Sequence, residues 1–153
     1  MKKRLFGTDG IRSLSNDEIF NNISLNTLAR SVLNNNKKLR IVIGRDTRES
    51  SKEIENNFIN ALKNNGATIF KVGLLSTPAI SYLTKKLNCD LGIVISASHN
   101  PYQFNGIKFF NKNGEKLSDS EESKIEKIFF KLIKKKSKDK NNGKIQIIKN
   151  PFS

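Results

Sequence analysis

The sequence predicts an α/β domain of three layers, in which helices cover both faces of a mixed, mainly parallel sheet of four strands. Two observations predict this class. Short apolar runs typical of buried strands alternate with longer segments whose apolar residues recur every three to four positions. The connections between these segments are short, and right-handed crossovers then make successive strands parallel and place helices on both faces.

The first two helices and the first strand are predicted in the first half of the chain. Ser24 is expected to cap a helix whose apolar residues recur at the spacing of one helix face. These residues are Leu25, Leu28, Ala29, Val32 and Leu33. A short apolar run at residues 39–43 predicts a buried strand. Ser50 and Glu53 then match a capping box, and Gly66 matches the end of the second helix.

The same alternation continues in the middle of the chain. Residues 68–73 predict a second strand. Thr77 as a cap, followed by Pro78, predicts a helix over residues 79–87. Residues 91–96 form an apolar run that predicts a third strand.

The fourth predicted strand, at residues 106–110, differs from the first three. Only residues 97–105 separate it from the strand before. Because this connection is too short for a parallel crossover, we expect the fourth strand to be antiparallel, and the sheet is therefore expected to be mixed.

The last part of the chain carries another helix signal. Ser118 and Glu121 match a second capping box. The apolar face of the helix that follows is formed by Ile125, Ile128, Phe129, Leu132 and Ile133. Residues 144–149 begin a further strand. We therefore expect residues 1–140 to form one domain, and residues 141–153 to begin a linker or first strand toward a second domain that is absent from the chain.

Composition narrows the functional classes. A chain of 153 residues can bury the core of one domain, and no apolar run approaches the roughly 20 residues of a membrane helix. The single Cys89 excludes an internal disulfide and suits a reducing compartment, so we expect a cytoplasmic protein without a membrane partner. The net charge of +14, densest at Lys131–Lys140, raises a basic nucleic-acid-binding module as an alternative. A solvated helix end explains this run more simply, because no RNA-binding signature accompanies it.

The most unusual stretch is the loop after the third strand, residues 96–105, which we call the serine loop. It places Ser98, the only histidine (His99) and Asn100 at the carboxyl end of a strand, where ligands bind in open α/β sheets. Pro101 keeps Asn100 out of helical geometry, so the loop should be tight and rigid. Ser98 beside His99 suggests an activated nucleophile. Neighbours in an extended chain point apart, however, so a polar turn explains the pattern equally well.

Two further residues could serve phosphate chemistry. Arg12 ends the stretch FGTDGIR, residues 6–12, whose glycines allow a close backbone approach and whose arginine could hold a phosphate with two hydrogen bonds. Lys108, in the fourth strand, would be a cation beside the serine loop if it faced that loop, and otherwise an ordinary surface lysine. The sequence contains no standard phosphate-binding loop, no Cys/His metal cluster and no G-x-S-x-G hydrolase motif.

Together, these segments resemble the α-D-phosphohexomutase superfamily, and within it the bacterial phosphoglucosamine mutase branch. The motifs that occur in that family's order and spacing are FGTDGIR at 6–12, GRDTR at 44–48, TPA at 77–79 and GIVISASHNPYQFNGIKFF at 92–110. The resemblance covers nearly the whole chain, but only the first of the family's four domains.

The resemblance implies a reaction. Ser98 would be a phosphoserine in an isomerase that interconverts glucosamine 6-phosphate and glucosamine 1-phosphate through a bound 1,6-bisphosphate. The product would serve amino-sugar nucleotide and cell-wall precursor synthesis. Mg²⁺ would bind an oxygen of the phosphate on Ser98, and the partner would be a phosphosugar.

The resemblance also implies roles for other residues of this chain. Arg12 would stabilise the transferring phosphate, and Lys108 would be the general acid and base. His99 and Asn100 would shape the serine loop and form hydrogen bonds within it. The arginines of the motif at 44–48 match the family, but no catalytic step is assigned to them.

This sequence also departs from the family's pattern. Ser13 stands where the family usually has glycine, and Phe104 where it usually has an acidic residue. The family's metal-binding loop belongs to its second domain, and its sugar-reading and distal phosphate loops to the third and fourth. We therefore expect the isolated chain to be inactive and to require domains 2–4. A phosphomannomutase or phosphoglucomutase fragment and a non-catalytic remnant remain alternatives, because the sugar-selecting segment is absent.

Overall fold

The computed structural model describes residues 4–36, 38–135, 143–149 and 151–152. Within these residues the strands are β1 (Ile11–Leu14), β2 (Arg40–Arg45), β3 (Thr68–Leu74), β4 (Leu91–Ile95), β5 (Phe104–Asn111) and β6 (Lys144–Ile147). The helices are α1 (Asn22–Leu33), α2 (Glu49–Asn64), α3 (Thr77–Lys86) and α4 (Asp119–Ile133), with a short 3-10 turn, η1 (Glu18–Phe20), before α1.

The strands form one mixed sheet in the order β1-β5-β4-β2-β3-β6. The β2 strand pairs in parallel with both β3 and β4, and β3 pairs in parallel with β6. The β5 strand runs antiparallel to both β4 and β1. The predicted class of a mixed, mainly parallel sheet and the predicted antiparallel direction of the fourth strand are therefore confirmed.

The predicted number of four strands is wrong, because the described residues form six. The β1 strand begins at the end of the FGTDGIR stretch, where no strand was predicted. Its four residues, Ile-Arg-Ser-Leu, carry no clear alternation, and it forms by pairing with β5. The β6 strand lies within the strand expected at residues 144–149, and it pairs in parallel with β3 at the edge of this sheet.

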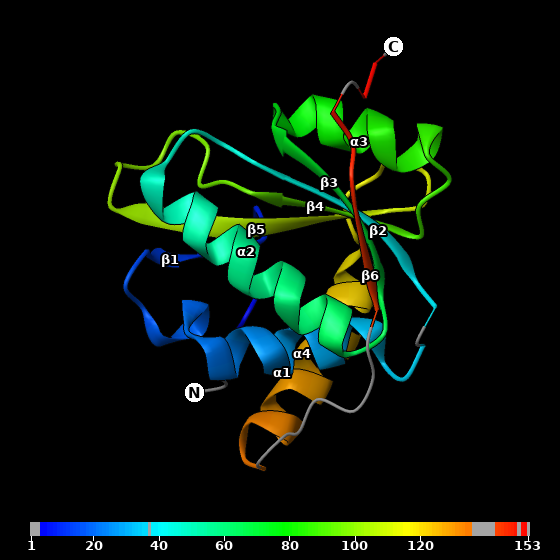
Figure 1. The fold of residues 1–153 in the computed structure, drawn as a ribbon. Helices are drawn as coiled ribbons and strands as arrows, with labels where there is room; N and C mark the ends of the chain where they lie inside the picture. Colours follow the sequence, from blue (N-terminus) through cyan, green and yellow to red (C-terminus); the bar gives the residue numbers. More distant parts are fainter. Residues whose placement is uncertain (1–3, 37, 136–142, 150, 153) are drawn as a thin grey trace.

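Helices cover both faces of the sheet, which gives the three expected layers (Figure 1). The α1, α2 and α4 helices pack on one face, over a large apolar core centred on residues such as Leu28, Phe58 and Ile93. The α3 helix covers the other face over a smaller core that contains Val42, Ile80 and Val94. Strand residues alternate between the two cores because successive side chains of a strand point to opposite faces.

Three of the predicted helix starts are displaced. The α1 helix is capped by Asn21, whose side chain accepts a hydrogen bond from the Ser24 amide at 2.8 Å, so Ser24 lies inside the helix. Ser76, one residue before Thr77, caps α3. The predicted capping box of Ser50 and Glu53 is wrong, because α2 already begins at Glu49. Its N-cap residue is Arg48, whose side chain makes no capping hydrogen bond.

The predicted capping box of α4 is confirmed. The Ser118 hydroxyl accepts a hydrogen bond from the Glu121 amide at 3.1 Å, and the Glu121 carboxylate accepts one from the Ser118 amide at 3.3 Å. The box satisfies two amides that would otherwise lack a partner at the start of the helix.

Replacement of Ser118 with alanine is expected to lower the free energy of unfolding by about 1 kcal/mol, the usual value of an N-cap side chain. Urea unfolding followed by circular dichroism measures this change. Ser120→Ala is the matched control, because Ser120 is an exposed residue in the first turn of the same helix. An equal loss in the two variants would contradict a capping role for Ser118.

Two expectations about the end of the chain fall outside the described residues. The proposed domain boundary at residue 140 lies within residues 136–142, and so does half of the lysine-rich run. The boundary therefore stays a prediction. Across the part of the chain that the structure describes, no helix combines the length and apolar character needed to cross a membrane.

Candidate functional site

The carboxyl ends of β2, β3 and β4 meet at one edge of the sheet, and the loops that follow them are joined by hydrogen bonds. The Asp46 amide, after β2, donates to the Ile95 carbonyl at 3.0 Å. The Leu75 amide, after β3, donates to the Arg45 carbonyl at 3.2 Å. The three polar loops therefore lie together at this edge, as expected for a ligand site of an α/β sheet.

The serine loop presents Ser98 on a tight turn. The Asn100 amide donates to the Ala97 carbonyl at 3.0 Å, and the Ser98 amide donates to the Ser96 hydroxyl at 3.0 Å. Ser98 has a φ of 54°, a left-handed conformation that is uncommon for residues other than glycine. Ala97 is buried, whereas Ser98 and His99 are exposed. The backbone is thus held from within while the Ser98 hydroxyl faces outward.

Arg12 reaches the serine loop from β1, the outermost strand on one side of the sheet. In β1 it is paired with Gly106 of β5, and its Nη1 donates to the Ala97 carbonyl at 3.0 Å. The Nε and Nη2 atoms of Arg12 are buried and have no hydrogen-bond partner. Buried polar groups are nearly always paired, so two unpaired guanidinium nitrogens beside the serine loop indicate a place for anionic oxygens.

The absence of a side chain at Gly106 allows this approach. A Cβ there would lie 2.6 Å from the Ile11 carbonyl oxygen, 2.8 Å from the Ser96 carbonyl oxygen and 3.2 Å from Cγ of Arg12. Any other residue would therefore force β1 away from the serine loop, and would move Arg12 with it.

Lys108 lies on the same face of the sheet as Arg12. In β5 it alternates with Ile107 and Phe109, whose side chains are buried in the large core on the opposite face. Burial lowers the pKa of Lys108, the nearby Arg12 lowers it further, and Asp9 partly opposes the shift. Burial, and after it the charge of Arg12, therefore favour the neutral amine of Lys108.

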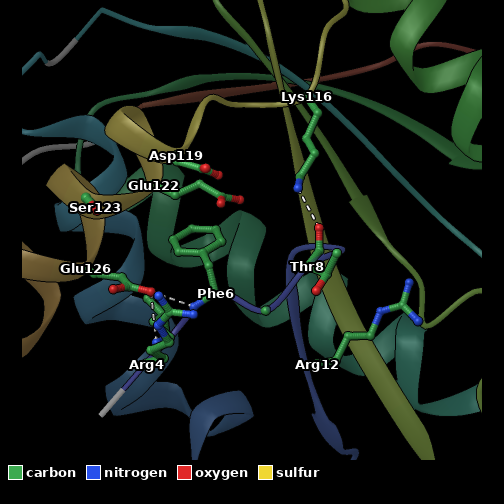
Figure 2. Close-up of a pocket in the computed structure, with 11 residues that line it drawn as sticks. Arg4, Phe6, Thr8, Arg12, Lys116, Asp119, Glu122, Ser123 and Glu126 are labelled. Atoms are coloured by element: carbon green, nitrogen blue, oxygen red, sulfur yellow. Dashed lines mark hydrogen bonds between the residues drawn. The ribbon is translucent and has the colours of Figure 1, made fainter. Parts of the chain in front are cut away.

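Two cavities adjoin these cations. Arg12 lines a cavity of about 620 Å³ between the N-terminal segment and the start of α4, and Lys108 lines a smaller one of about 150 Å³. Figure 2 shows the larger cavity, with Arg12 on one side and the acidic residues of α4 on the other. The linings of these two cavities do not include Ser98, which lies on the exposed turn.

Two side chains, those of Glu126 and Lys116, hold the N-terminal segment that borders the larger cavity by three hydrogen bonds. Glu126 of α4 accepts hydrogen bonds from the Leu5 and Phe6 amides at 3.1 and 2.8 Å. Lys116 donates to the Thr8 carbonyl, as drawn in Figure 2. Because β1 follows directly, these contacts restrict the position from which Arg12 projects.

The structure also identifies two residues of the site that the sequence did not single out for a role. Arg48 is buried beneath the serine loop and donates to four of its backbone carbonyls. Asn105 is fully buried, and its amide nitrogen donates to the Ser50 and Ser51 hydroxyls at 2.8 and 2.9 Å. The only signal available in the sequence was that GRDTR and the Asn-Gly pair belong to matching motifs.

Within the described residues, neither Cys89 nor a cluster of metal-ligating side chains adds chemistry to this site. Burial raises the pKa of Cys89 to about 11, so the buried thiol stays protonated and is a poor nucleophile. Among the residues that the structure describes, no three His, Cys, Asp or Glu side chains lie close enough together to hold a metal ion.

Comparisons with known proteins give consistent matches. The sequence profile of "Phosphoglucomutase/phosphomannomutase, alpha/beta/alpha domain I" matches residues 3–136. A phosphoglucosamine mutase of Clostridioides difficile is 44% identical over 81% of this chain and 28% of its own length. One of Deinococcus deserti is 46% identical over 82% of this chain and 29% of its own length. The chain thus spans less than a third of these relatives.

Solved structures share the fold. A protein of Thermus thermophilus, assigned as a phosphomannomutase, has a TM-score of 0.81 at 25% identity and matches 97% of this chain and 34% of its own. A phosphoglucomutase/phosphomannomutase family protein of Burkholderia thailandensis has a TM-score of 0.77 at 19% identity, over 95% of this chain and 33% of its own.

Proposed function

Because the chain belongs to the phosphoglucomutase/phosphomannomutase family, of which it contains the α/β/α domain I, we propose that it is the serine-bearing domain of a phosphoglucosamine mutase. Its substrate would be a glucosamine phosphate. The chain corresponds to less than a third of the matching relatives, so the complete activity would also require the regions that follow in those proteins.

In the proposed reaction, Ser98 carries the phosphoryl group. The bond between Oγ of Ser98 and phosphorus breaks as the C1 hydroxyl oxygen of glucosamine 6-phosphate bonds to phosphorus, which gives the 1,6-bisphosphate. After the intermediate turns over, its other phosphoryl group returns to Ser98 and leaves glucosamine 1-phosphate. Exposure of Ser98 on a rigid turn supports this role, because phosphoryl transfer depends on positioning and on charge stabilisation.

The observation that carries the proposal is the pair of buried, unpaired nitrogen atoms of Arg12 beside the serine loop. A phosphoserine carries roughly 1.5 to 2 negative charges at neutral pH. Nε and Nη2 of Arg12 could donate to its oxygens while Nη1 keeps its bond to the Ala97 carbonyl. Arg12 would thus stabilise the charge on the transferring group without any rearrangement of β1.

Lys108 would accept the proton of the attacking sugar hydroxyl and return it in the reverse step. A lysine with an ordinary pKa is protonated at neutral pH and cannot act as a base. Burial and the Arg12 charge lower the pKa of Lys108, which supports a larger share of neutral amine. His99 and Asn100 would shape the loop, and the Asn100 amide already closes its turn.

The family resemblance implies Mg²⁺, but the described residues offer no cluster of carboxylates to hold it. The one ligand that we propose from this chain is the phosphate on Ser98, with the carboxylates supplied by another domain. When bound, the ion would neutralise part of the phosphate charge. We also propose a cytoplasmic location, which suits the single buried thiol.

Phosphoryl transfer to Ser98 tests the proposed function. The chain would be combined with the remaining domains of the Clostridioides difficile relative and Mg²⁺, and incubated with glucosamine 1,6-bisphosphate. Mass spectrometry is expected to find one phosphoryl group on Ser98 and none in Ser98→Ala. Phosphate on another residue, or equal phosphorylation of Ser98→Ala, would reject the assignment. Glucose and mannose bisphosphates, tested in parallel, distinguish the phosphoglucomutase and phosphomannomutase alternatives.

A further inference from the structure

Arg48 uses its whole guanidinium group on the protein. It lies at the N-cap of α2 and is largely buried beneath the serine loop. An arginine side chain has five N–H donors, and all five of Arg48 are engaged. Their acceptors are the Asp46 carboxylate at 3.1 Å and the backbone carbonyls of Ser98 at 3.1 Å, Asn100 at 2.8 Å, Pro101 at 2.7 Å and Phe104 at 3.0 Å.

These acceptors lie on both arms of the loop. Nη2 binds the carbonyls of Ser98 and Asn100, and Nη1 binds those of Pro101 and Phe104. One planar group therefore holds carbonyl dipoles that would otherwise point at one another without a partner. A lysine has only three donors around a single point, and cannot span the same four carbonyls.

Arg12 and Arg48 hold successive carbonyls of the loop. Arg12 binds the carbonyl of Ala97, and Arg48 binds that of Ser98. The left-handed φ of Ser98 lies between these two fixed points. All of these bonds use the loop's backbone, so the Ser98 hydroxyl is left free. Two nitrogen atoms of Arg12, Nε and Nη2, have no partner, whereas Arg48 has no donor left to offer a ligand.

We propose that Arg48 is a positioning residue, which holds Ser98 in the left-handed conformation that brings its hydroxyl to Arg12 and does not itself bind phosphate. The part of this inference that concerns phosphate rests on the proposed function. The part that concerns the loop backbone is independent of it.

Further hydrogen bonds join the serine loop to the first turn of α2. The Glu49 amide donates to the Tyr102 hydroxyl at 3.2 Å, and Asn105 is bonded to the Ser50 and Ser51 hydroxyls. Asp46 in turn accepts a hydrogen bond from the Ser51 hydroxyl and fixes the plane of the Arg48 guanidinium. Arg48 is therefore the central link between the serine loop and α2.

Arg48→Lys in the full 153-residue chain tests the inference, with Arg40→Lys as the matched control. Arg40 also donates to two backbone carbonyls, those of Leu87 and Asn88, but at the opposite end of β2. Hydrogen exchange is measured in peptides that cover residues 96–105. Because bonds to charged groups contribute roughly 1.5–3 kcal/mol each, we expect exchange to be about ten-fold faster, or more, in Arg48→Lys. Exchange in the control should equal that of the wild type.

The second measurement reports on the position of Ser98 itself. Phosphoserine is incorporated at position 98 during synthesis, and its second pKa is followed by phosphorus NMR. In the wild type and in Arg40→Lys, the Arg12 charge should lower this pKa below that of free phosphoserine, whereas in Arg48→Lys it should move back toward the free value. Unchanged loop exchange together with an unchanged phosphoserine pKa in Arg48→Lys would overturn the inference.

Different results would reject the contact of phosphoserine with Arg12 and the hold of Arg48 on the loop backbone. A wild-type phosphoserine with the pKa of the free amino acid would reject the contact with Arg12, and with it the phosphate part of the inference. The exchange comparison would still decide whether Arg48 holds the loop. If Arg48→Lys does not fold, nitrogen NMR of the wild type decides instead. The Arg48 guanidinium hydrogens should exchange much more slowly than those of Arg40, and equal rates would overturn the inference.

Discussion

Replacement of Arg12 with alanine is expected to slow phosphoryl transfer to Ser98 by about a thousand-fold, the lower end of what a transition-state arginine contributes in phosphoryl transfer. The structural reason is the hydrogen bonding of the Arg12 guanidinium. One nitrogen is bound to the Ala97 carbonyl, and the other two are buried without partners. Alanine would remove two unpaired nitrogen atoms that are already in place, and would also release the Ala97 carbonyl before Ser98.

The rate of phosphate appearance on Ser98, measured with the missing domains supplied, tests this expectation. Arg12→Lys should be intermediate, because it keeps the charge but loses the planar fork. Arg40→Ala is the control, since it removes an exposed arginine from the other end of the sheet. Thermal unfolding of each variant separates a loss of the site from a loss of the fold. A rate within about two-fold of the wild type in folded Arg12→Ala would contradict the role of Arg12. Each ten-fold change in rate corresponds to about 1.4 kcal/mol of activation free energy, so a two-fold change would be only a small part of the expected effect.

Glu55 is expected to make the domain less stable as the pH rises from about 4.5 to about 7. This carboxyl on α2 is fully buried, 3.5 Å from Nε of Arg45 and 3.7 Å from Nζ of Lys71, and neither of its oxygens accepts a hydrogen bond. Burial raises the pKa of Glu55 from 4.5 to about 7, although Lys71 and Arg45 oppose the shift. Desolvation of the charged form thus outweighs the two cations.

The sign of the effect follows from proton binding. Between pH 4.5 and about 7 the folded chain keeps the Glu55 proton that the unfolded chain has lost, so stability falls as the pH rises. At about 1.4 kcal/mol for each pH unit between the two pKa values, the full loss is about 3 kcal/mol. The contribution is fully present below the unfolded pKa and is lost above the folded one.

Glu55→Gln should remove this dependence, because glutamine keeps the shape of the side chain and cannot ionise. Lys71 would keep its hydrogen bond to Asn56, and Arg45 its bond to the Asp46 carbonyl. Urea unfolding at about pH 5 and about pH 8 measures the difference, with Glu53→Gln on the exposed side of the same helix as the control. Equal pH dependence in Glu55→Gln and the wild type would show that Glu55 does not titrate in this range.

Parts of the fold with strong local signals were predicted well. The three central strands are almost wholly apolar runs, and the α4 capping box is set by two residues three positions apart. The exact cap residues of α1 and α3 were not predicted, because serine, threonine and asparagine residues that lie close together are nearly equivalent caps. At α2, the N-cap residue Arg48 donates hydrogen bonds to the serine loop instead of capping the helix with its side chain.

The serine loop illustrates which part of the site is local. Asn-Pro after an apolar strand is enough to predict a tight turn at the carboxyl end of that strand, and the turn is present. The left-handed conformation of Ser98 was not predictable, because serine has no preference for it. In the structure, Ser98 has this conformation between two backbone carbonyls that accept hydrogen bonds from Arg12 and Arg48.

The sequence by itself determined the α/β class, the strand that delivers Ser98 and the turn that exposes it, because these features depend on hydrophobic period and on the sterics of adjacent residues. Only the tertiary structure decided which cations meet the serine loop. Arg12 is 85 residues from its acceptor at Ala97, and Arg48 is 50 residues from its acceptor at Ser98. Contacts over such separations come from the pairing of β1 with β5 and from the packing of α2, for which short stretches of sequence carry no signal.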